Sequence, residues 1–108
     1  MKNYLLIYHA PAEVMAAMAT ATEEQKQESM KPWFTWKDKL GEQLVDFGAP
    51  LMGGQRLLPD GSSKDSTKEV TGYSIIKANS MEDAKTLLSG HPHLSGGCDI
   101  EVHETIAM

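Results

Sequence analysis

The amino-acid sequence predicts an α+β fold: a ferredoxin-like βαββαβ sandwich, with two helices on one face of a four-stranded antiparallel sheet. The segment NYLLIY, residues 3–8, is apolar on both of its alternating faces, which is typical of a central strand. Two capped helical patterns alternate with strand patterns in the order strand, helix, strand, strand, helix, strand. A chain of 108 residues can build one core, so we expect a single domain spanning residues 1–108.

The first long helix has a clear start signal. Thr22, followed three residues later by Gln25, predicts a capping box that opens a helix near residue 23. Apolar residues then recur at helical spacings, and Gly48 provides a stop, so the helix is expected to continue as far as residue 47. The residues of this apolar face are Met30, Trp33, Leu40, Leu44 and Phe47.

Pro32 lies inside this pattern and predicts a kink or a break near Lys31, because proline lacks the amide that continues the helix. The next segment, Leu51–Leu58, predicts the second strand, interrupted by a glycine pair. The sequence Pro-Asp-Gly-Ser at 59–62 predicts a turn, and the polar run from there to Glu69 predicts a hairpin loop.

The second half of the chain predicts a strand, a helix and a strand. Tyr73–Ala78 has strand character, and Ser80 with Asp83 caps a helix that Gly90 ends. The buried stripe of that helix consists of Met81, Ala84, Leu87 and Leu88. In the final strand, Cys98, Ile100 and Val102 alternate with Asp99, Glu101 and His103.

The two-sided apolar pattern of the first strand also predicts an oligomer. Helices on one face leave the other face of the sheet bare, and a contiguous apolar patch of that kind marks an interface. A symmetric homodimer, sheet against sheet, is the simplest way to cover it.

Composition narrows the possible partners. A net charge of −5 gives no reason to bind phosphate backbones, so we expect no nucleic-acid partner. No apolar run is long enough to span a bilayer and no secretory signal opens the chain, so we expect no membrane association and a cytoplasmic location. The nucleotide-binding, hydrolase and metalloprotease motifs are absent, and the single Cys98 lacks zinc-site spacing, so neither a cofactor nor a metal is predicted.

Four segments of the chain resemble the YCII-related family, which includes the DGPF-type proteins. They are KNYLLIYHAP, KPWFTWKDKLGEQLVDFGAPLMGG, TGYSIIKANSMEDAKTLLSGHPHLSGG and IEVHET. The resemblance implies a dimeric α/β barrel of ferredoxin-like subunits, in a family largely without established activity. Some members carry a His and Asp pair proposed as catalytic, with the His early in the first long helix. That position falls near Met30 here, so the pair is not carried over.

The expected topology places the candidate site at the C-terminal end of the first strand. His9 lies at that end, and Tyr73 begins a strand expected beside it. The histidines of the loop before the last strand, His91 and His93, and Trp33 of the first long helix are expected to converge on the same cleft. His9 is the candidate general base and Tyr73 a hydroxyl donor, while Trp33, His91 and His93 are candidate ligand contacts.

Each candidate also has a structural interpretation. His9 could hydrogen-bond only a loop carbonyl, the pair formed by His91 and His93 is too small for a zinc site by itself, and Trp33 fits a core position. Trp36, nearly a turn further around the helix, is expected to reach the subunit contact.

The function that these residues predict is a small-molecule-binding homodimer, either an enzyme using acid or base chemistry from His9 or a binding protein without catalysis. The alternative is a noncatalytic accessory or interaction module with structural histidines. Cofactor-independent oxygenation of an aromatic compound is a third interpretation, which rests on fold analogy alone.

Overall fold

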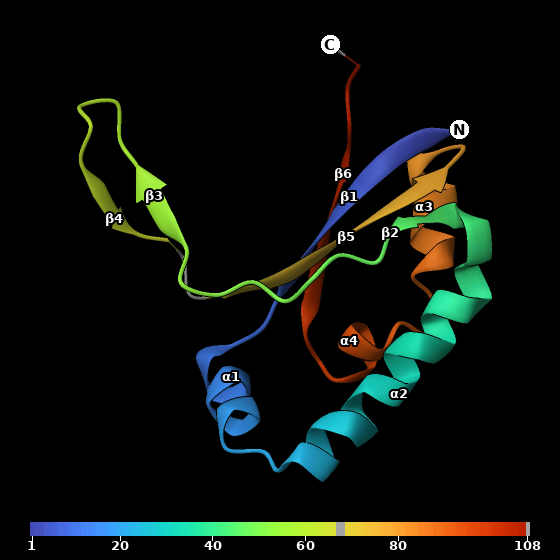
Figure 1. The fold of residues 1–108 in the computed structure, drawn as a ribbon. Coiled ribbons are helices and arrows are strands. Elements are labelled where there is room, and N and C mark those ends of the chain that lie inside the picture. The colour runs from blue at the N-terminus through green and yellow to red at the C-terminus, as the bar shows by residue number, and fades with distance from the viewer. Residues whose placement is uncertain (67–68, 108) are drawn as a thin grey trace.

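The computed structural model describes residues 1–66 and 69–107 and leaves aside the side chains of Ala12, Met15 and Met18. Its centre is a four-stranded antiparallel sheet in the order β2-β5-β1-β6 (Figure 1). The strands of this sheet are β1 (Lys2–His9), β2 (Leu44–Asp46), β5 (Val70–Ala78) and β6 (Asp99–Glu104). As predicted, the first strand is central and antiparallel to both of its neighbours.

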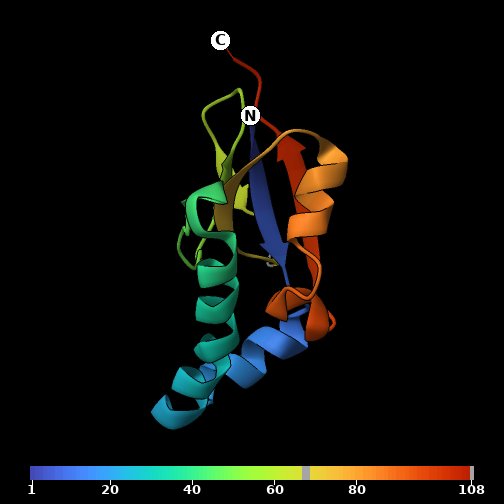
Figure 2. The ribbon, with the colours of Figure 1, turned by 90° about the vertical axis from the view of Figure 1, so that its right-hand side faces the viewer.

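Two helices, α2 (Glu23–Leu40) and α3 (Met81–Leu87), cover one face of this sheet, as Figure 2 shows from the helix side. Two further helices are α1 (Ala12–Ala19), before α2, and α4 (Pro92–Ser95), after α3. The predicted α+β fold with an antiparallel sheet is confirmed, whereas the patterns predicted neither α1 nor α4. In the described part of the chain, no helix combines the length and apolarity needed to cross a bilayer.

The core lies between the sheet and the helices. Alternate residues of β1 and β5 are buried there, and the residues between them are only half-buried. The buried apolar cluster contains Tyr4, Leu6, Tyr8, Trp36, Leu40, Ile76, Ala78, Ala84 and Leu88. One chain therefore covers one face of β1. We call the other face, which carries Leu5, Ile7, His9, Tyr73 and Ile75, the open sheet face.

The predicted start of α2 is confirmed. The Thr22 hydroxyl accepts the Gln25 amide at 3.1 Å, and the Gln25 side chain accepts the Thr22 amide at 2.9 Å, which together form a capping box. Of the kink or break predicted near Lys31, the break is wrong, because α2 runs through Pro32 without interruption. Proline removes a single helical bond, and the turns beyond it are held by the buried Trp36.

The predicted end of α2 is also wrong. The helix ends at Leu40, where Gly41 adopts a φ of 57°, and a 3₁₀ turn leads directly into β2. Leu44 belongs to a strand and pairs with Ile76 of β5. Its helical spacing from Leu40 is therefore coincidental, and the glycine at positive φ marks the real boundary.

The second strand of the sheet is consequently Leu44–Asp46 and not the predicted Leu51–Leu58. Within the latter, β3 (Gln55–Leu57) pairs only with β4 (Ser63–Asp65) in a separate two-stranded hairpin. The predicted turn at its tip is confirmed: Gly61 has a φ of 90°, and the Leu58 amide donates to the Ser62 carbonyl at 2.8 Å. The loop predicted from this turn to Glu69 is wrong in part, because Ser63–Asp65 form β4. Residues 67–68 of the expected loop lie outside the described part of the chain.

The second half of the chain follows its predictions. The Ser80 hydroxyl accepts the Asp83 amide at 3.2 Å at the start of α3, and Gly90 has a φ of 76° beyond its end. In β6 the predicted alternation holds, with Ile100 and Val102 half-buried toward the helices.

Candidate functional site

The sheet separates the predicted site residues instead of gathering them in one cleft. His9 and Tyr73 lie on the open sheet face, whereas Trp33 and His91 lie among the helices on the other face. The predicted convergence of all five candidates is therefore wrong. We call the group on the helix side, Tyr8, Trp33, Trp36, Ser74 and His91, the helix-side cluster. The group His9, Tyr73, Glu101 and His103 is the sheet-face cluster.

His91 is the centre of the helix-side cluster and has no exposed surface. It is the N-cap of α4, and its Nδ1 accepts the amide of His93 at 3.0 Å. The indole rings of Trp33 and Trp36 meet the imidazole at centroid distances of 4.7 and 4.4 Å. Burial, and to a lesser degree the charge of His93, lowers the pKa of His91 to about 4, so the ring is neutral at physiological pH.

A chain of buried hydrogen bonds runs from this ring to the backbone. Because Nδ1 of His91 accepts a bond, the proton of the neutral ring belongs on Nε2, 3.4 Å from the Tyr8 hydroxyl. That hydroxyl donates to Ser74 Oγ at 2.7 Å, and Ser74 donates to the Phe47 carbonyl at 2.6 Å. Burial raises the pKa of Tyr8 to about 12. Each side chain in this series of hydrogen bonds thus has a partner inside the protein, which indicates that the series has a structural role.

The tryptophans complete this packing. Trp36 is only 3% exposed and donates its indole N–H to the Leu87 carbonyl at 3.1 Å, so the expectation that it reaches a subunit contact is wrong. Trp33 is half-buried and places its ring at right angles to Tyr8, 5.0 Å away. This end of the core is filled by aromatic rings.

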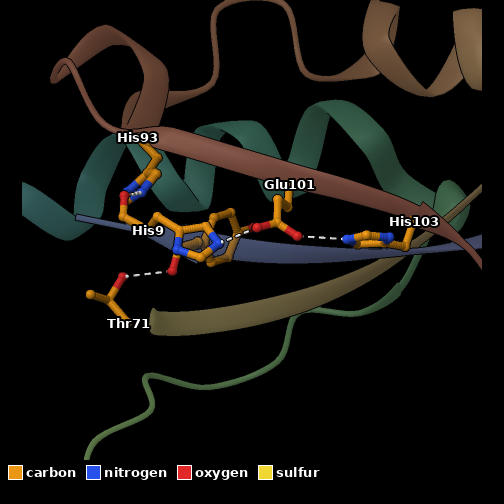
Figure 3. A network of polar contacts seen from close by, with 6 residues as sticks. His9, Thr71, His93, Glu101 and His103 are labelled. Atoms are coloured by element: carbon orange, nitrogen blue, oxygen red, sulfur yellow. Dashed lines mark hydrogen bonds and ion pairs between the residues drawn. The ribbon is translucent and has the colours of Figure 1, made fainter. Parts of the chain in front are cut away.

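The sheet-face cluster is more exposed to solvent than the helix-side cluster, and its central residue is Glu101 (Figure 3). Its Oε1 lies 2.9 Å from Nε2 of His9, and its Oε2 accepts Nε2–H of His103 at 2.6 Å. Side-chain exposure rises from 21% at His9 to 53% at Glu101 and 58% at His103. The His103 hydrogen bond first, and the neighbouring His9 to a lesser extent, hold the pKa of Glu101 below its ordinary range.

The contact between His9 and Glu101 is close without being well aligned. At 2.9 Å the two groups are within ion-pair range, yet the angles do not make it a hydrogen bond, and His9 Nε2 has no other partner in the described chain. Tyr73 and Glu101 both stand directly opposite Ile7, on either side of β1. A phenol, an aliphatic side chain and a carboxylate thus form one row across the sheet, with His9 diagonal to it.

His93 connects the two clusters. Its Nε2 donates to the His9 carbonyl at 2.7 Å, and the Thr71 hydroxyl donates to the Tyr8 carbonyl at 3.3 Å (Figure 3). Both bonds fix the main chain at the C-terminal end of β1, from which the His9 side chain extends.

Sequence reasoning missed several members of both clusters. Tyr8, Ser74, Glu101 and His103 were assigned no role, although the alternation of Glu101 and His103 already placed them on one side of the last strand. Their partnership with His9 follows from the register between β1 and β6, which no local pattern reveals.

An apolar groove of about 480 Å³ lies elsewhere, between α3 and β6. It is lined by Met81, Lys85, Leu88, Leu94, Ile100 and Val102 and includes none of the predicted site residues. Among the described residues, no group of three or more His, Cys, Asp or Glu side chains is arranged to hold a metal ion.

Comparison with known proteins identifies a similar fold. No protein-family model and no curated protein matches the chain. Among solved structures, it is similar to 5-chloro-2-hydroxyhydroquinone dehydrochlorinase (TftG) from Burkholderia phenoliruptrix AC1100, in a complex with 2,5-dihydroxybenzoquinone. The TM-score is 0.50 and the sequence identity 12%, over 92% of this chain and 90% of the other. At this identity the likeness establishes a common fold.

Proposed function

We propose that this chain is a small-molecule-binding protein that acts as a homodimer and transfers protons through His9. The observation that carries the proposal is the position of His9 Nε2, 2.9 Å from the Glu101 carboxylate on a partly exposed face. Imidazole titrates near neutral pH, and a carboxylate beside it selects its tautomer. With N–H at Nε2 facing Glu101, the lone pair on Nδ1 is the group that takes a proton from a ligand.

The neighbours of His9 support a flat, partly apolar ligand. Ile7 and Ile75 give the open sheet face an aliphatic surface, and the Tyr73 phenol supplies a hydroxyl donor on the same face. The ligand contacts expected from Trp33 and His91 are not part of this proposal, because those residues pack on the opposite side of the sheet.

The homodimer and the family remain parts of the proposal. The half-buried aliphatic side chains Leu5, Ile7 and Ile75 need a cover that one chain does not supply, which supports a second copy. The resemblance to YCII-related proteins supports a dimeric α/β barrel. The cytoplasmic location is likewise proposed, supported by a single free cysteine, Cys98.

A first probe comes from the protein of similar fold, which was solved with 2,5-dihydroxybenzoquinone. We expect this compound, or another member of a panel of hydroxylated aromatics and quinones, to raise the melting temperature of the wild-type protein. The His9→Ala variant should lose the shift, and Lys26→Ala, on the exposed surface of α2, should keep it. An equal shift in wild type and His9→Ala would refute a ligand at His9.

Proton transfer is tested separately from binding. The ring hydrogens of 2,5-dihydroxybenzoquinone exchange with D₂O through protonation and deprotonation at carbon, which proton NMR follows as a loss of signal. Wild type should accelerate this exchange, and His9→Gln, which keeps a polar side chain without a titratable ring, should not. If the compound binds but its hydrogen exchange is not accelerated, the protein binds small molecules without acid–base catalysis by His9.

A specific observation also favours the alternative, a noncatalytic interaction module. On the helix side, the C-terminal end of β1 is filled by Tyr8, Trp33, Trp36 and His91, all packed against one another. Such packing leaves no room for a ligand there. The module is favoured if no compound of the panel shifts the melting temperature while the protein still forms dimers.

A further inference from the structure

The hairpin of β3 and β4 projects from the body of the molecule. Together with the segment that leads into it, residues 51–66, we call it the hairpin arm. It lies on the side of the sheet opposite α2 and α3, as Figures 1 and 2 show from two directions. Its strands pair with each other and with no strand of the main sheet. A lone two-stranded hairpin is at best marginally stable in water, so the arm needs a surface to pack against.

The overall dimensions show how much surface the chain leaves exposed. The radius of gyration is 15.3 Å, whereas a compact domain of this length has about 13 Å. The accessible surface is 7652 Å², whereas a compact monomer of this mass exposes about 5,950 Å². The excess of roughly 1,700 Å² exceeds the ~800 Å² that each partner buries in a stable interface.

The arm and the open sheet face carry complementary apolar surface. On the arm, Met52 is 90% exposed and Leu57 is 78% exposed. On the open sheet face, Leu5, Ile7 and Ile75 are half-buried, and this face turns toward the side on which the arm lies (Figure 1). Each surface is of the kind that marks an interface.

The charged residues of the hairpin do not oppose this packing. Arg56 and Lys64 form the cross-strand pair next to Leu57, so they lie on the opposite face of the hairpin from Leu57. Asp60 and Asp65 balance their charge within the arm.

We propose that the hairpin arm packs against the open sheet face of a second copy of this chain. A two-fold interface must be complementary to itself, and one copy carries both halves: an apolar arm and an apolar sheet face. This inference rests on the homodimer of the proposed function. It adds that the arm stabilises that homodimer. Because the open sheet face also carries His9, a ligand there would lie at the interface, but the role of the arm is tested without a ligand.

Sedimentation equilibrium and light scattering at micromolar concentration test the assignment. The wild-type protein is a dimer, and the double variant Met52→Lys/Leu57→Lys raises its dissociation constant by about tenfold or more. The matched control is Met30→Lys, an equally apolar residue that is 38% exposed on α2 on the far side of the molecule. The control keeps the wild-type dissociation constant.

A second variant, Met52→Ser/Leu57→Ser, removes the apolar surface of the arm without adding charge and also weakens the dimer. Near-ultraviolet circular dichroism of the buried Trp36 verifies that each variant is folded. A wild-type dimer that both folded arm variants retain with unchanged affinity overturns the role of the arm and leaves the homodimer standing. A monomeric wild type overturns the homodimer and the arm together.

Discussion

The two faces of β1 carry polar clusters of similar composition with opposite properties. On the helix side, His91 and Tyr8 are buried, and their polar atoms bond one another or the backbone. On the open sheet face, His9, Glu101 and His103 are partly exposed, and one ring nitrogen lacks an aligned partner. The same residue types are therefore joined by buried hydrogen bonds where water is excluded, and form a looser, partly exposed group where it is not.

This contrast shows that a strongly shifted histidine pKa does not by itself mark a functional residue. His91 has the most strongly shifted histidine pKa of the chain, which would ordinarily mark an active site. Here burial among tryptophans explains the shift, and the ring nitrogens are occupied. Exposure and free hydrogen-bonding capacity separate the two clusters better than the size of a pKa shift does.

The largest expected effect is on the helix side. Trp36→Ala removes a buried indole from the ring of His91 and leaves the Leu87 carbonyl without its donor. We expect the free energy of unfolding to fall by about 3–5 kcal/mol, as for other buried aromatic truncations. Phe34→Ala, at a half-exposed position of the same helix, should change it by less than about 1 kcal/mol. Urea unfolding compares the two, and similar losses would contradict the assigned core.

The acid dependence of stability should trace to His91. Its pKa is about 4 in the folded protein and 6.5 without burial, so below pH 6.5 the unfolded chain takes up a proton that the folded chain excludes. The stabilising contribution is therefore complete above pH 6.5 and is lost as the pH falls toward 4. The loss is about 2 kcal/mol between pH 6.5 and 5, where carboxylates scarcely interfere.

The control for this acid effect is His91→Gln, which cannot titrate. Urea unfolding at pH 7, 6 and 5 should give a flatter profile for the variant than for wild type, whatever its absolute stability. Parallel profiles would show that another group is responsible for the loss.

A matched pair of tyrosines compares the two faces directly. Tyr8→Phe deletes the central hydroxyl of the buried chain, leaves Ser74 without a donor, and should lower stability by about 1–3 kcal/mol. Tyr73→Phe makes the same change one strand away on the open sheet face and should alter stability by less than about 0.5 kcal/mol. Equal effects on unfolding would erase the distinction between the clusters.

Local signals in the sequence were sufficient for much of the fold. The capping box at Thr22, the Ser80 cap and the two-sided apolar pattern of residues 3–8 each depend on neighbours within a few positions, and all three were confirmed. The short strand β2 was not predicted, because Leu44 continues the helical spacing from Leu40 and becomes a strand residue only through pairing with β5.

The site was harder to predict because it depends on register and burial. His9 and Tyr73 were correctly placed on neighbouring strands, but which face each candidate occupies follows from packing. His91 is buried because it caps α4 beside two tryptophans, and Glu101 meets His9 because β6 pairs with β1 in one register. Neither fact is encoded in local spacing.

The smallest expected effect concerns the pKa of Glu101 on the open sheet face. The hydrogen bond from His103 is the main cause of its lowered pKa, so His103→Ala should raise that pKa toward its ordinary value, while folding stability hardly changes because both groups are exposed. Carboxyl ¹³C NMR across an acid titration measures the shift, with Glu82, an exposed glutamate that pairs with Lys85, as an internal reference. If the Glu101 pKa stayed where it is, His9 rather than His103 would be the residue that stabilises the carboxylate, and the sheet-face cluster would reduce to a pair.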